Sequence, residues 1–163
     1  MILLLDQIRN SKDCVVLPSS GLPKINRVHS LPKDVEEFCS ECGGIKFFTS
    51  SDYSIEIVTP EEMKLSNPMI LPEGWEADVP DDDISNDWYI VAKAGPEQSI
   101  SIDLNEERIG KSYDSFWDIH ASPGQSGIVA TSFTELLEDI FKSRGKYWFW
   151  LADDFVSLGD AYD

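Results

Sequence analysis

Basic residues are scarce in this chain. Its 163 residues include 13 Lys and Arg against 30 Asp and Glu, which leaves a formal net charge of −17. A surface of this charge repels phosphate, so it argues against DNA, RNA or an anionic membrane as the partner. The same charge steers a basic protein toward the chain, although acid also serves simply to keep a globular protein dispersed.

Long hydrophobic runs are absent. The N-terminal run Met1–Leu5 stops at Asp6, short of the roughly 7–15 apolar residues of a secretory signal, and no basic residue precedes it. No later segment approaches the roughly 18 unbroken apolar residues of a membrane span. We therefore expect an intracellular, cytoplasmic protein.

Cysteine and histidine are few, with three and two residues. Cys39 and Cys42 form the only close pair, and His29 and His120 stand alone in the sequence. A structural zinc site would lack its third and fourth ligands. A redox pair is expected at the amino end of a helix, whereas this pair closes one. Two buried thiols that pack a helix are the better interpretation, and we expect no metal.

Motifs that carry catalysis are also missing. No GxxxxGK or GxGxxG loop occurs, and Gly124–Gly127 is one residue short of a nucleophile elbow. The run Asp81–Asp83 lacks the alternate spacing and the glycine turn of a calcium loop. Paired carboxylates are not diagnostic among 30 acids. We expect no enzyme and no cofactor, and we keep a hydrolase with an acid pair as a remote alternative.

The chain does have the composition of a folded domain, with 42% hydrophobic and 11% aromatic residues. A domain of this length buries roughly two-thirds of its unfolded surface without a disulfide or a metal. We therefore expect one domain over residues 1–163.

Apolar residues recur with a helical period at three places. The patterns predict helices over residues 1–12, from Leu31 to Cys42, and from Ser132 to just before Gly145. A further short helix is predicted from Thr59 to Leu65, with Glu62 reaching back to the Thr59 amide.

Strand patterns occupy the middle of the chain. They predict strands over residues 45–48, 53–58, 88–93 and 99–104, with another within 110–120. In the fourth, Ile100, Ile102 and Leu104 alternate with Ser99, Ser101 and Asp103, which predicts a sheet with one wet face. The aromatic tail over residues 147–156 should cover the domain's own core or, as the alternative, bind a partner.

The segment from Asn67 to Asp87 predicts a long acidic loop. Loops of this length are uncommon in compact domains and are often functional, so this one is the first place to look for a partner site. We name residues 73–87 the acidic loop; its carboxylates would supply charge, and Trp75 with Trp88 would supply buried contact area. The predicted partner-binding residues are Glu73, Trp75, Glu76, Asp78, Asp81, Asp82, Asp83, Asp87 and Trp88.

The order of these patterns resembles the SUKH superfamily over about residues 23–141. The resemblance rests on the Leu31–Pro32 helix start with Phe38, the Gly43–Gly44 pair, the Pro60 helix start, Trp88 leading a strand, the alternation over 100–104, and the Ser132–Phe133 helix start. Two departures are the segment Ile25–His29, where the family usually has a glutamate before Leu-Pro, and the aromatic extension over 145–163.

The resemblance implies an α+β fold, with a mainly antiparallel sheet and helices packed against it. It also implies a non-enzymatic immunity protein that binds and silences a cognate toxin, as in toxin–antitoxin and polymorphic toxin systems. A basic protein toxin, such as a nuclease with a cationic groove, would fit the charge of this chain. The alternative is a scaffold or regulatory module that binds an endogenous protein.

Overall fold

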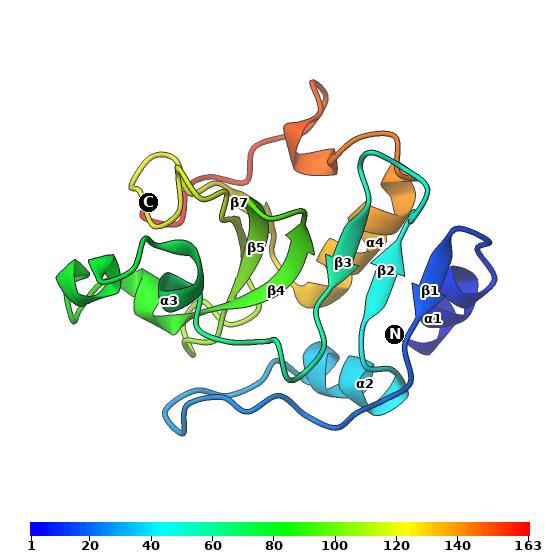
Figure 1. Cartoon of the computed structure of the whole chain (residues 1–163), viewed down its shortest axis with the longest axis horizontal. Coiled ribbons are helices and arrows are strands. Elements are labelled where there is room, and N and C mark those ends of the chain that lie inside the picture. Colours follow the sequence, from blue (N-terminus) through cyan, green and yellow to red (C-terminus); the bar gives the residue numbers. More distant parts are fainter.

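Seven strands form one antiparallel sheet in the computed structural model, which describes residues 1–163 (Figure 1). Each strand pairs with the next one along the chain, in the order β1 to β7. The strands are β1 (Cys14–Val16), β2 (Ile45–Phe47), β3 (Ile55–Ile57), β4 (Trp88–Ala94), β5 (Gln98–Asp103), β6 (Ser112–Asp114) and β7 (Ile128–Ala130). This arrangement confirms the predicted antiparallel sheet.

Four α-helices and three 3₁₀ turns accompany the sheet. They are α1 (Ile2–Arg9), α2 (Lys33–Glu41), α3 (Asn67–Ile70), α4 (Phe133–Ser143), η1 (Trp75–Asp78), η2 (Ile84–Asp87) and η3 (Phe149–Leu151). Helices α2 and α4 meet where the rings of Phe38 and Phe133 pack edge to face, with centroids 5.0 Å apart. No helix combines the length and the apolar composition that a membrane crossing needs.

The core confirms the three helical patterns. Leu5 and Ile8 of α1, Val35 and Phe38 of α2, and Leu136 of α4 are buried in one cluster. Helix α4 begins as its sequence indicates, because the Ser132 hydroxyl accepts a hydrogen bond from the Glu135 amide at 3.1 Å. The predicted α+β class is therefore confirmed. Strands β1 and β7, of three residues each, were not predicted.

The helix predicted from Thr59 to Leu65 is wrong. The Glu62 carboxylate does accept hydrogen bonds from the Thr59 amide at 3.2 Å and hydroxyl at 2.8 Å, but only turns follow. The chain instead returns to the sheet: the Lys64 carbonyl accepts from the Ile90 amide at 2.9 Å, and Leu65 lies opposite Tyr89. Pairing with β4 takes the backbone groups that a helix would need.

The predicted wet face of β5 is also wrong. Ser101 and Asp103 are completely buried, and Ser99 is 8% exposed. Serine hydroxyls from two covering segments reach this face: Ser66 and Ser115 each lie 2.7 Å from the Ser101 hydroxyl. Alternation showed which residues share a face of the strand, but it could not show that other segments cover the polar one.

The aromatic tail packs on the domain's own core, as the first of the two interpretations predicted. Phe149 and Trp150 are buried, and Trp148 stacks on Trp150 with centroids 6.0 Å apart. Beyond them the chain runs beside β7, where the Ile128 amide donates to the Gly159 carbonyl at 3.0 Å. The tail thereby covers an edge that would otherwise expose unpaired backbone groups.

Candidate functional site

The acidic loop projects from one end of the sheet beside α3 (green, at the left of Figure 1). It contains the short turns η1 and η2 in place of the irregular loop that the sequence predicted. Five of its carboxylates are exposed, and none of them forms an ion pair: Glu73, Glu76, Asp78, Asp81 and Asp82. The tip of the loop therefore carries concentrated negative charge that no neighbouring cation offsets.

Trp75 stands on this tip with 63% of its surface exposed. Its backbone is held, because the Trp75 amide donates to the Pro72 carbonyl at 2.9 Å and the Glu76 carboxylate accepts from the Gly74 amide at 3.0 Å. Gly74 has a φ of +88°, a left-handed conformation that glycine adopts without strain. An exposed indole on a fixed backbone is the kind of side chain that anchors protein interfaces.

Trp88 does not share this exposure, and the prediction that it supplies contact area to a partner is wrong for this fold. It is completely buried at the start of β4 and packs on Tyr113, with ring centroids 4.4 Å apart. Its indole N–H donates to the Asp103 carboxylate at 3.1 Å. Trp88 follows the acidic loop directly in the sequence, and it begins β4, in agreement with the strand predicted over residues 88–93.

Asp83 and Asp87 are turned inward and tie the loop to the domain. Asp83 accepts hydrogen bonds from the Ser85 amide and from the Tyr162 hydroxyl of the tail, both at 2.9 Å. Asp87 binds the Arg108 guanidinium at 2.9 Å and the His29 imidazole at 2.8 Å. These two carboxylates anchor the base of the loop, while the other acids face solvent.

A buried ion-pair network underlies this base. The completely buried Asp103 carboxylate accepts from the Arg108 Nε at 2.8 Å and from the Tyr113 hydroxyl at 3.1 Å, besides the Trp88 indole. Burial, together with the Asp103 carboxylate, raises the pKa of the Tyr113 phenol, which stays a neutral donor. A buried carboxylate is tolerated only when such donors and a countercharge surround it. Arg108 therefore joins Asp103 in the core to Asp87 in the loop.

His29 extends the network to the chain segment before α2. Its side chain is 6% exposed, and its ring lies 3.1 Å from the Tyr89 hydroxyl on the side opposite Asp87. The Asn26 amide donates to the same hydroxyl at 3.0 Å. His29 stands alone in the sequence, and its partners lie some sixty residues away along the chain, so no local pattern indicated this contact.

His120 makes a third connection. Its Nε2 lies 2.9 Å from the side-chain Oδ1 of Asn67, and the Asn67 Nδ2 donates to the Ser85 hydroxyl at 3.0 Å. The other ring nitrogen is buried without a partner, and burial lowers the pKa of His120 to about 4. The neutral ring thus ties the segment after β6 to α3 and η2.

Cys39 and Cys42 are buried, which confirms the interpretation that they pack the helix. Burial raises the pKa of Cys39 to about 11 and also raises that of Cys42, so both remain thiols rather than reactive thiolates. No group of three or more histidine, cysteine or acidic side chains is placed to hold a metal ion. A surface hollow of about 700 Å³ has a single carboxylate, Glu61, in its lining. This hollow does not provide the acid pair that a glycosidase-type mechanism requires.

The buried imidazole makes stability depend on pH. The unfolded chain protonates His120 near its ordinary pKa of 6.5, and the folded chain only near 4. Its contribution to the free energy of unfolding is therefore complete above pH 6.5 and is lost as the pH falls toward 4, by about 3 kcal/mol. Urea unfolding at several pH values should show that His120→Gln loses less stability over this interval than the wild type. Equal losses in the two proteins would contradict this assignment, because the other acid-titrating groups are common to both.

Comparisons with known proteins agree with the family expected from the sequence. The chain matches the model of the SMI1/KNR4 family (SUKH-1) over residues 28–139. It is similar to the immunity protein YokJ of Bacillus subtilis (strain 168), with 45% identity over 161 residues, which covers 99% of this chain and 94% of the relative. No solved structure matches it. Since the family model spans most of the sequence and the relative almost all of it, the chain belongs to the SMI1/KNR4 (SUKH-1) family.

Proposed function

We propose that this chain is an immunity protein that binds and neutralises a cognate protein toxin. The observation that carries the proposal is the 45% identity, along nearly the whole of both chains, to a protein named as an immunity protein. Neutralisation by binding requires no catalytic group in the immunity protein, because covering the toxin's working surface is sufficient. The chain would act in the cytoplasm, where it meets the toxin before damage occurs.

We assign a basic surface to the toxin. The acidic loop is the part of this chain that contacts this basic surface. Five unpaired carboxylates at the tip would speed association with a cationic surface through long-range attraction. Trp75 would then supply apolar contact area at the centre of the charged patch.

The anchored base of the loop supports this assignment. Asp83, Asp87 and Asn67 are each held by side chains from other segments, so the loop does not need to be ordered when the partner arrives. Preorganisation removes part of the entropic cost of association. A fixed scaffold with an exposed, charged tip is what a fast and tight inhibitor needs.

Co-expression tests the function itself. The open reading frame next to the gene for this chain is expressed with and without the chain, and both growth and complex formation are scored. We expect the neighbouring product to arrest growth alone, and we expect the chain to restore growth and to co-purify with that product. Arrest that the chain does not relieve would contradict the immunity role, and a harmless neighbour would favour a regulatory module that binds an endogenous protein.

The interface is tested by removing charge from the loop. The triple variant Asp78→Asn/Asp81→Asn/Asp82→Asn should associate with the toxin about tenfold more slowly at low salt, because these exposed carboxylates provide the attraction. The matched control is Glu36→Gln/Glu37→Gln/Glu41→Gln, which removes three exposed carboxylates from α2. Stopped-flow association rates over a range of salt concentrations measure both variants. Equal slowing of the loop variant and the α2 control would mean that association depends only on net charge. If the loop variant associates as fast as the wild type, the acidic loop is not the site of attraction.

The contribution of the Trp75 indole is tested in the same experiment with a variant and a matched control. Trp75→Ala should speed dissociation by tenfold or more, the effect typical of an aromatic anchor at an interface. Trp117, which is 49% exposed and lies outside the acidic loop, provides the control variant Trp117→Ala. Unchanged dissociation of Trp75→Ala would place the apolar contact elsewhere.

A further inference from the structure

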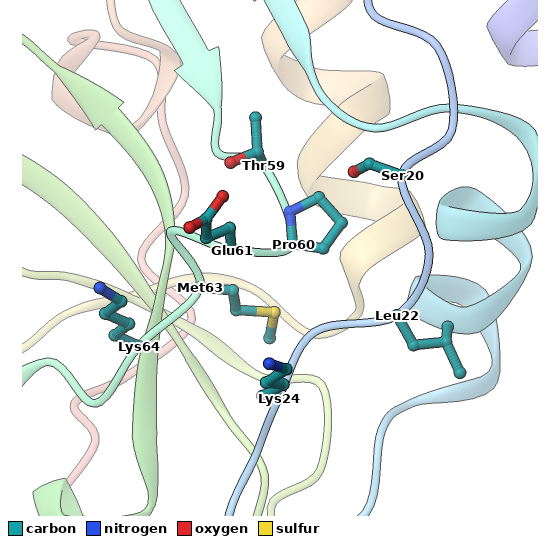
Figure 2. A pocket seen from close by; sticks show the side chains of 8 residues that line it. All are labelled: Ser20, Leu22, Lys24, Thr59, Pro60, Glu61, Met63 and Lys64. Carbon is teal, nitrogen blue, oxygen red and sulfur yellow. The ribbon is translucent and has the colours of Figure 1, made fainter.

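A groove runs between two chain segments that lie outside the acidic loop. One wall is the segment 20–26 and the other is the segment 59–69. Two hollows, of about 700 and about 510 Å³, lie along it. Figure 2 shows the larger hollow, in which Met63 of one wall points toward Lys24 of the other, while Leu22 and Lys64 extend outward on opposite sides. The two hollows share the residues Lys24 and Lys64, so they form one continuous groove.

The shared residues give the groove a charge opposite to that of the molecule. Lys24 and Lys64 are exposed, neither forms an ion pair, and both lie where the hollows meet. Glu61, the one carboxylate in the groove, lines only the larger hollow. On a chain with a net charge of −17, this junction is a local site for an anionic group.

Apolar side chains flank the lysines on both sides. Leu22, in the larger hollow, is 57% exposed, and Met69, in the smaller one, is 52% exposed. Ile25, Leu65 and Tyr89 complete an apolar lining in the smaller hollow. Exposed apolar surface gathered in a concave site favours a ligand with apolar groups on either side of its charge.

The walls also offer free backbone donors. The segment 19–25 has no regular secondary structure, and none of its amides donates a hydrogen bond within the chain. On the opposite wall the amides of Glu61 and Lys64 are also free of internal acceptors. Unpaired amides beside side-chain pockets are the features by which proteins recognise extended peptides.

We propose that this groove binds an extended segment of a partner protein in which one Asp or Glu is flanked by apolar residues. The carboxylate lies between Lys24 and Lys64, the flanking side chains enter the two hollows, and the peptide carbonyls accept from the free wall amides. The charge of the groove selects an acidic segment, whereas the acidic loop selects a basic surface. The proposal does not depend on the identity of the partner as a toxin.

The test uses a blocked synthetic peptide, acetyl-Ser-Leu-Glu-Leu-Ser-amide, and the same peptide with Gln in place of Glu. Titration of the ¹⁵N-labelled full chain followed by NMR should give saturable shifts at the amides of Leu22, Lys24 and Lys64. The Gln peptide should bind about tenfold more weakly, because it loses the ion pairs. The absence of saturable shifts, shifts confined to other surfaces, or equal affinity of the two peptides would overturn the proposal.

Charge reversal locates the site. Lys24→Glu/Lys64→Glu should weaken binding of the Glu peptide at least tenfold, whereas Lys12→Glu/Lys146→Glu, which changes net charge equally at exposed lysines elsewhere, should not. Glu61→Gln should leave binding unchanged or tighten it, since it removes a like charge. Equal loss in the two lysine variants would overturn the proposal. NMR shifts at the groove amides that depend on protein concentration in the absence of peptide would also overturn the proposal. They would identify a second copy of the chain as the occupant of the groove.

Discussion

The position of the acidic loop depends on one buried carboxylate. Asp103 is completely enclosed at the end of β5, where solvent cannot offset its charge. It is stable there because an arginine, an indole and a phenol all direct donors at it. Removing any of these donors would leave part of a buried charge uncompensated, which is the costly form of such a network.

Arg108 transmits this constraint to the surface, because the same guanidinium binds Asp87. Asp87 in turn holds His29, and His29 meets Tyr89, so the loop, the segment before α2 and strand β4 are joined through one set of polar contacts. The sheet therefore has two different faces. Helices and apolar side chains cover one, and polar side chains from distant segments cover the other. The base of the acidic loop rests on the second, through the contacts of Asp87 with Arg108 and of Arg108 with Asp103.

Parts of this architecture were predictable from the sequence because their cause is local. The apolar stripe with Phe38 and the capping serine Ser132 are readable within a dozen residues, and both appear in the structure. The burial of Trp88 and Asp103 was not readable, because the segments that enclose them lie elsewhere in the chain. The exposure of Trp75 and of the five tip carboxylates agrees with the loop predicted from composition, and their contact with a partner remains a prediction.

The Asp103 network holds the acidic loop in place. Hydrogen exchange of Asp103→Asn tests it most directly, read at the Ser85 amide in the loop and at the Leu104 amide, which donates to the Asp87 carbonyl. The control is Asp139→Asn, which removes a solvent-accessible ion pair with Lys142 on α4. We predict that protection at both amides falls about a hundredfold in Asp103→Asn and stays unchanged in the control. Protection that survives the loss of the Asp103 charge would mean that this network does not hold the loop.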